Sequence, residues 1–247
     1  MISDFSKGVR YAVAGFSLAR TKGVKRYVAM PLFINILLFT LGIYYAFGLA
    51  NSGMTMLLSW LPGWLDWLSW LLWVIFGALM LILVFYTFTL VANLVGAPFN
   101  SLLAEKLEEK LTGNMPPSSG RLIDTLRGIS GAVLSEFRKF GYLISRMLPL
   151  VIISFIPVIN IAAPALWFIF GAWMLALEYL DYPMGNHGFT FNEQRATVQN
   201  RRSLMLGFGS VIMVMTMVPV LNFLAMPVAV AGMTQLWVKE FSDSAPK

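Results

Sequence analysis

The distribution of charged residues along the chain predicts a multi-pass membrane protein. Four long stretches contain no Asp, Glu, Lys or Arg: Tyr27 to Leu65, Trp67 to Ala104, Met147 to Leu177 and Ser203 to Val238. Each is longer than the roughly 20 residues that a helix needs to cross about 30 Å of hydrocarbon. We therefore predict an all-α integral membrane protein that forms a single membrane domain over residues 1–247, and we exclude soluble, disordered and collagen-like chains.

The first two stretches predict two full transmembrane helices, over residues 27–50 and 68–95. Pro31 is expected in the first turn of the first helix, where its missing N–H is tolerated. Residues 68–95 make a helix of about 42 Å, so this helix must tilt or project from the bilayer. We expect it to continue past Pro98 to about Leu111.

A cytoplasmic amphipathic helix is predicted over residues 121–146. Apolar residues recur there at intervals of three and four, and charged residues lie between them. Such a helix lies on the membrane surface or against a partner helix.

Two proline-broken hairpins are predicted over residues 147–180 and 203–238. The first arm of the first hairpin, Met147 to Ile156 before Pro157, has only ten residues, which make about 15 Å of helix, half a bilayer. Asn160 and Asn222 follow the breaks as candidate N-caps of the returning half-helices, whose N-terminal ends favour anions. We therefore expect hairpins that penetrate the membrane only halfway.

The same breaks also fit ordinary tight turns between two full spans, exposed at the outer surface. Both arrangements leave every Lys and Arg on the cytoplasmic side, so the charge pattern does not separate them.

The cations determine the predicted orientation. None of the 18 Lys and Arg residues lies between Tyr27 and Glu105, and both flanks of this segment are basic. The positive-inside rule places the N-terminus, residues 1–26, and the segment after Glu105 in the cytoplasm. The net charge of +6 then reflects topology and attraction to anionic membrane lipid, and it requires no nucleic-acid partner.

Several kinds of chemistry are missing from the sequence. It has no cysteine, one histidine and no GxxxxGK[ST] loop, so we expect no metal site, no cofactor and no ATP site. No nucleophile–base pair suggests a catalytic residue, so we expect no enzyme. His187 is expected at the end of a polar loop that begins at Tyr182, where it has either a structural role or a proton-linked one.

Two charged features near the predicted cytoplasmic face are candidates for function. Gly23, Val24, Lys25 and Arg26 combine a flexible glycine, two cations and a helix start, which suits either an oxyanion site or an interfacial anchor. Glu105 has no cationic partner three or four residues away on its own helix. Its partner is expected to be Arg26, another subunit or cytoplasmic water.

Several motifs are distributed along nearly the whole chain. In chain order they are Gly23 to Arg26, Pro31 to Asn35, Ala97 to Asn100 with Leu102 to Glu105, Asp181 to Pro183 with Asn186 and His187, and Pro219 to Asn222 with Met226 to Ala229. In this order they resemble the motifs of the bacterial CysZ sulfate permeases. The resemblance implies a protein of the bacterial inner membrane that takes up sulfate for assimilation and cysteine biosynthesis. It also implies two long transmembrane helices, two pairs of half-penetrating helices and a homo-oligomer, dimeric or larger.

The resemblance further implies a sulfate site at Gly23, Val24, Lys25 and Arg26. Lys25 departs from the family pattern, where arginine is common, and loses the planar two-pronged donor. We hypothesise that Asn35, Asn100, Asn160 and Asn222 offer polar positions along the sulfate path. A non-transporting membrane scaffold is the main alternative, and a membrane-embedded enzyme is the third.

Overall fold

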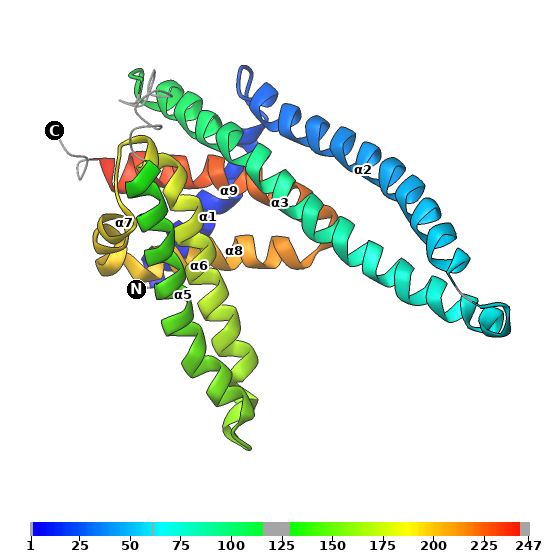
Figure 1. The fold of residues 1–247 in the computed structure, drawn as a ribbon. Coiled ribbons are helices and arrows are strands. Elements are labelled where there is room, and N and C mark those ends of the chain that lie inside the picture. Colours follow the sequence, from blue (N-terminus) through cyan, green and yellow to red (C-terminus); the bar gives the residue numbers. More distant parts are fainter. Residues whose placement is uncertain (1, 61, 116–128, 243–247) are drawn as a thin grey trace. The chain divides into compact units, whose positions relative to one another are not determined.

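A computed structural model describes residues 2–60, 62–115 and 129–242, and within these ranges helices are joined by short turns and no strand occurs (Figure 1). The helices are α1 (Ile2–Ala19), α2 (Lys25–Ser59), η1 (Gly63–Leu68), α3 (Ser69–Thr112), α5 (Ile129–Phe155), η2 (Ile159–Ala162), α6 (Ala163–Asn186), α7 (Phe191–Val198), η3 (Gln199–Arg201), α8 (Arg202–Met217) and α9 (Pro219–Glu240). Among the described residues, four segments are long and apolar enough to cross a membrane: Lys25–Ser59, Gly63–Thr87, Ile159–Asn186 and Pro219–Glu240. The chain is thus a multi-pass membrane protein.

Residues 29–99 form one compact unit, made of most of α2, η1 and the first part of α3. α2 runs to Ser59, beyond residue 50 where the sequence prediction ended it. Pro31 lies about two turns into α2, because the helix begins at Lys25, so its expected place in the first turn was wrong. The most apolar windows of both spans expose their side chains all round, so lipid or another protein chain must cover them.

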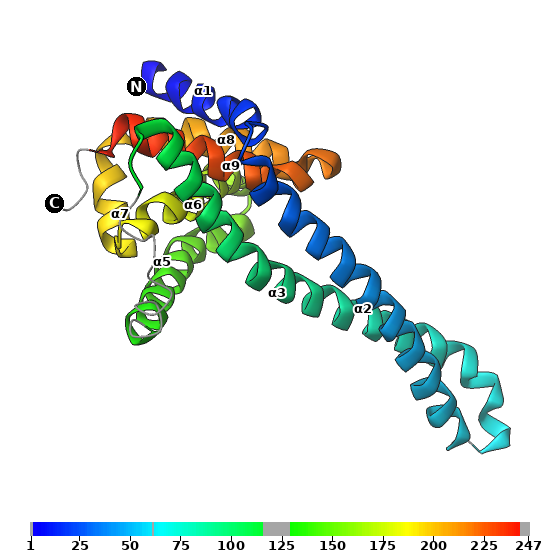
Figure 2. The same cartoon turned by 90° about the horizontal axis from the view of Figure 1, so that it is seen from above.

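The second unit comprises residues 1–28 and 100–247, and in it α1 packs against α8 and α9 (Figure 2). No helix was predicted before residue 27. The buried face of α1 is a stripe of small residues: Gly8, Ala12, Gly15 and Ala19. A Cβ atom on Gly15 would lie 2.1 Å from the carbonyl oxygen of Val228, so only glycine allows this backbone approach.

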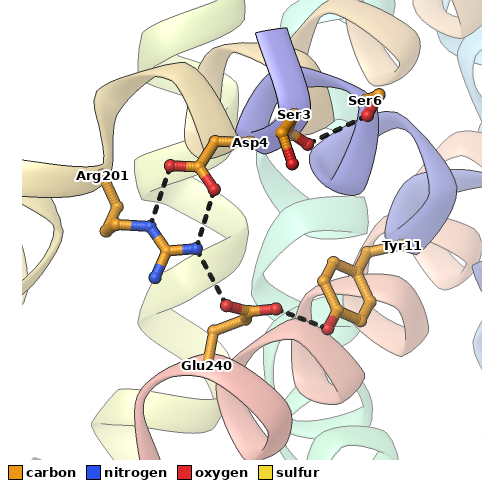
Figure 3. A network of polar contacts seen from close by, with 6 residues as sticks. All are labelled: Ser3, Asp4, Ser6, Tyr11, Arg201 and Glu240. Carbon is orange, nitrogen blue, oxygen red and sulfur yellow. Dashed lines mark hydrogen bonds and ion pairs between the residues drawn. The ribbon is translucent and has the colours of Figure 1, made fainter. Parts of the chain in front are cut away.

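A polar network joins the start of α1 to η3 and the end of α9 (Figure 3). The Arg201 guanidinium donates to both carboxylate oxygens of Asp4, at 3.1 and 3.2 Å, and to Glu240 at 2.9 Å. The Tyr11 hydroxyl donates to the other oxygen of Glu240 at 2.7 Å. Burial and this hydrogen bond raise the pKa of Tyr11 to about 12, so the tyrosine stays a donor at neutral pH.

α5 and α6 form a helical hairpin that differs from the predicted one. α5 runs without interruption from Ile129 to Phe155, with Pro149 inside it. The end of the predicted amphipathic helix and the ten-residue arm are therefore one helix of 27 residues, about 40 Å long. The structure therefore has no boundary between residues 146 and 147, where the sequence prediction ended the amphipathic helix and began the hairpin. Residues 121–128 of the predicted amphipathic helix lie outside the described ranges.

The two proline breaks separate α5 from η2 and α8 from α9, but the asparagines do not cap helices. α6 begins after Ala162 and α9 begins after Val218. Asn160 lies inside η2 and Asn222 inside α9, and both side chains are exposed. The N-cap prediction was wrong because proline occupies one of the first two positions of each helix, and a helix can start there without a side-chain cap.

Candidate functional site

The turn between α1 and α2 positions the first candidate residues. Gly23 adopts a φ of +87°, in the left-handed region that favours glycine. The Thr21 carbonyl accepts hydrogen bonds from the N–H groups of Val24 at 3.0 Å and Lys25 at 3.3 Å. Val24 is 2% exposed and belongs to the hydrophobic core. The turn is therefore anchored by Val24, and the side chains of Lys25 and Arg26 remain exposed.

A cationic cavity of about 400 Å³ lies between this turn and the end of α3. Its lining residues are Lys22, Gly23, Val24 and Arg26 from the turn, and Lys106, Glu109, Lys110 and Gly113 from α3 and the residue after it. Four cationic side chains thus surround the space with one carboxylate. Such a balance favours an anion of small size.

Two contacts fix the α3 side of the cationic cavity. The Lys110 ammonium donates to the Lys22 carbonyl at 3.0 Å, which joins α3 to the turn. Lys106 forms an ion pair with Glu109 at 2.6 Å, and the hydrogen bond raises the pKa of Lys106. Lys106 is therefore charged at neutral pH, and part of its charge is balanced by Glu109.

Arg26 keeps donors available for an anion. Its guanidinium donates to the Tyr27 hydroxyl at 3.0 Å and lies 4.9 Å from the centre of the Tyr27 ring. A guanidinium has five N–H donors, so this contact orients the group without exhausting it. The N–H groups of Val24 and Lys25, by contrast, already donate inside the turn. Recognition in the cationic cavity must therefore depend on side-chain charge more than on backbone N–H groups.

The predicted site residues are only partly brought together. Gly23, Val24 and Arg26 line the cationic cavity, whereas Lys25 is exposed beside it and does not line it. Glu105 is half-buried on α3. Asn35 belongs to α2, and its side chain is outside the described part of the structure.

Asn100 serves to dock α3 on α6. It is 4% exposed, and its amide donates to the Tyr182 hydroxyl at 3.3 Å. One residue further along α3, Ser101 donates to the Asn186 side chain at 2.5 Å, and Asn186 returns a hydrogen bond to the Ser101 carbonyl at 3.0 Å. These contacts explain why α3 and α6 carry polar residues at the positions where the two helices meet. They leave Asn100 little freedom to contact a moving ion.

Sequence reasoning missed a buried pair that includes Glu108, eight residues or about two turns beyond Asn100 on α3. The Glu108 carboxylate lies 2.7 Å from Nε2 of His187, and Glu108 is 6% exposed. The His187 ring lies 5.4 Å from the Trp237 ring. The segment from Tyr182 to Asn186, expected as a loop, is the last turn of α6, and His187 is its C-cap. Asn100, Ala104 and Glu108 share one face of α3, but no spacing in the sequence links Glu108 to His187, 79 residues further along the chain.

Residues 11–227 match the family described as "Sulfate transporter CysZ/Etoposide-induced protein 2.4". The chain belongs to this family. It is also 41% identical over 233 residues to "Sulfate transporter CysZ" of Pseudomonas syringae pv. tomato (strain ATCC BAA-871 / DC3000), an alignment that covers 94% of this chain and 92% of that protein. The CysZ resemblance noted in the sequence is thus confirmed. The family match includes the cationic cavity and both proline breaks.

Proposed function

We propose that this protein carries sulfate across the bacterial inner membrane and supplies it for assimilation and cysteine biosynthesis. Membership of a sulfate transporter family supports this function. The observation that carries it in this chain is the cationic cavity, where Arg26, Lys22, Lys106 and Lys110 surround a space of about 400 Å³. The sequence has no P-loop that would bind ATP. The flow of sulfate is therefore driven by the sulfate gradient itself or by the gradient of another ion that moves with sulfate.

The cations lie where they can bind sulfate without preventing its release from the path. A doubly charged ion loses much hydration energy on entering a bilayer, so a route needs water, helix dipoles and a few charges. The long uncharged spans hold no cation to trap sulfate at their centre, and the cations gather at the end of α3 and the turn before α2. Binding that is weak along the path permits conduction.

We also propose an arrangement of the protein in the membrane. The N-terminus lies in the cytoplasm, the hairpins α5–α6 and α8–α9 penetrate without crossing fully, and the protein forms a homo-oligomer. The exposed apolar spans of residues 29–99 support assembly or lipid contact. Asn35, Asn160 and Asn222 remain candidate polar positions on the path, and Lys25 and Glu105 are candidates at its cytoplasmic mouth.

Uptake of radiolabelled sulfate into vesicles that contain only the purified protein tests this function. Arg26→Gln removes one charged contact of the cationic cavity, worth about 1.5 kcal/mol, so the half-saturating sulfate concentration should rise about tenfold. Arg20→Gln is the matched control, because Arg20 is exposed near the same turn and does not line the cavity. It should leave uptake close to that of the wild type.

The experiment tests the location of the sulfate site and the transport function independently. Equal uptake by Arg26→Gln and Arg20→Gln would reject the cationic cavity as the sulfate site while leaving transport intact. Wild-type protein that moves no more sulfate than empty vesicles would reject transport and favour the membrane scaffold.

A further inference from the structure

A second cavity, of about 660 Å³, lies between α5, α6 and the segment from α7 to α8, on the unit that contains residues 100–247. Three arginines line it: Arg146 of α5, Arg195 of α7 and Arg202 at the start of α8. Its other wall is apolar and includes Leu150, Ile169 and Phe170. We call it the arginine cavity. The proposed sulfate site does not use any of its residues.

An aromatic ring gathers two of the three arginines. The guanidinium carbons of Arg195 and Arg146 lie 4.8 and 5.6 Å from the centre of the Tyr142 ring. Trp173 fixes that ring by donating its indole N–H to the Tyr142 hydroxyl at 3.0 Å. Arg202 is held by a hydrogen bond of its Nε to the Gln199 carbonyl at 3.1 Å. The positions of all three cations are therefore set by described contacts.

The arginine cavity carries an uncompensated positive charge. Over the described ranges, no carboxylate lies within 4 Å of Arg146, Arg195 or Arg202, although other cations such as Arg201 and Lys139 are paired in this way. No Asp or Glu is among the residues that line the cavity. Three like charges at one opening repel each other, and an anion held between them removes that cost.

The apolar wall of the arginine cavity favours an anion with a hydrocarbon part over an inorganic anion. Along α5, Leu150 follows Arg146 by one turn in the direction of the break at Pro157. On α6, Phe170 and Ile169 lie on the break side of Trp173, so both helices change from polar to apolar in the same direction. Ile169 is 50% exposed. A ligand that fits has an anionic head and a hydrocarbon chain.

We propose that the arginine cavity binds an anionic phospholipid. The phosphodiester lies among Arg146, Arg195 and Arg202, and one acyl chain follows Leu150, Ile169 and Phe170 toward the break. Arginine recognises phosphate oxygens with its planar fork, and basic pockets between helices on the cytoplasmic side of a membrane suit anionic lipid headgroups. The lipid would join α5 to α7 and α8.

Native mass spectrometry of the full-length protein in detergent tests the headgroup. Phosphatidylglycerol should remain bound to the wild type, while the triple variant Arg146→Gln, Arg195→Gln, Arg202→Gln should need at least tenfold more of this lipid for equal occupancy. The matched control is Arg10→Gln, Arg20→Gln, Lys239→Gln, which removes three exposed cations elsewhere and should bind as the wild type does. Equal occupancy in the two triple variants would overturn the proposal.

Two further ligands separate the possible sources of the phosphate group. Phosphatidylcholine should bind at least tenfold more weakly than phosphatidylglycerol, and equal binding would overturn the role of the arginines. Inorganic phosphate at millimolar concentration should not displace the lipid. Displacement would show a site for free anions and would overturn a phospholipid site.

A substitution in the apolar wall tests the acyl chain. Ile169→Asn should lower phosphatidylglycerol occupancy several-fold. Ile152→Asn is the matched control, because Ile152 is 55% exposed on α5 and does not line the arginine cavity. Both sites are exposed, so neither change should prevent folding. The same occupancy in the two variants would overturn the acyl-chain assignment.

Discussion

The carboxylate of Glu108 and the imidazole of His187 lie 2.7 Å apart and join α3 to the C-terminal end of α6. The second carboxylate oxygen of Glu108 is buried, and no described residue donates a hydrogen bond to it. A buried polar group that loses its partner costs more than the hydrogen bond itself contributes. The pair is therefore expected to matter for the docking of α3.

A double-mutant cycle should show strong coupling between Glu108 and His187. His187→Asn and Glu108→Gln are each expected to lower the free energy of unfolding by about 1–3 kcal/mol, because each leaves the other group poorly paired. The double variant should lose less than the sum of the two single losses. Reversible unfolding in detergent, followed by circular dichroism, measures these energies. Additive losses would mean that the two groups do not interact in the folded protein.

Replacing Gly15 with alanine should disrupt the packing of α1. The added Cβ would meet the Val228 carbonyl at 2.1 Å, a backbone atom that cannot move without shifting α9. We expect a loss of about 1–3 kcal/mol or more, seen as a lower Tm in detergent. Gly141→Ala is the control, because nothing lies within 4 Å of its Cβ and alanine favours the helix. Equal Tm values for the two variants would contradict the close packing of α1.

Arg201→Gln should loosen the junction of α1, η3 and α9. The substitution removes three hydrogen bonds, two to Asp4 and one to Glu240, and leaves two carboxylates close together. Because the Arg201 side chain is 31% exposed, solvent screens part of the effect, and we expect a loss of about 1–2 kcal/mol. Arg201→Lys should recover part of it, since it keeps the charge without the fork. A Tm of Arg201→Gln equal to that of the wild type would rule out this role.

Glu193 should make a contribution to stability that depends on pH. Its carboxylate accepts hydrogen bonds from the hydroxyl and the N–H of Thr190, both at 2.7 Å, and these bonds lower its pKa below 4.5. A group with a lowered folded pKa stabilises the protein above its unfolded pKa and loses this contribution as the pH falls through the folded pKa. The Tm difference between wild type and Glu193→Ala should therefore be full at pH 7 and shrink below about pH 4.5. A difference that stayed constant down to pH 3 would contradict the capping role.

The long apolar segments could be predicted from sequence because hydrocarbon imposes one length on every spanning helix. Two of the four candidate spans, Lys25–Ser59 and Gly63–Thr87, contain the helices predicted from that length. The other two, Ile159–Asn186 and Pro219–Glu240, lie in the segments predicted as half-penetrating hairpins. The course of the chain before residue 27 could not be predicted, because α1 buries glycine and alanine, which give no apolar signal. Its packing depends on how closely two backbones approach, and this becomes visible only in three dimensions.

The positions at which proline ends a helix could be predicted less well than the apolar spans. Pro157 ended a helix and Pro149 did not, although both interrupt the same apolar stretch. A proline inside a helix is tolerated in membrane proteins when neighbouring groups satisfy the freed carbonyl. The sequence therefore revealed where prolines lie but not which of them the surroundings would accommodate.

Only one side of the candidate site could be predicted from the sequence. The turn from Gly23 to Arg26 was found because cations, a glycine and a helix start lie together in the chain. Lys106 and Lys110 were not assigned to that site, because a turn and a helix end separated by more than eighty residues come together only on folding. The pairing of Glu108 with His187 could not be predicted for the same reason, because 79 residues separate them in the chain.

The contact of Lys110 with the Lys22 carbonyl has a consequence for biogenesis. One wall of the cationic cavity is synthesised before the apolar hairpin of residues 29–99, and the other wall only after it. Because the two walls lie on either side of these helices in the chain, the cavity is complete only after both long helices have been synthesised. A nascent chain that ends before Lys106 has the turn from Lys22 to Arg26 but none of the α3 residues that line the cavity.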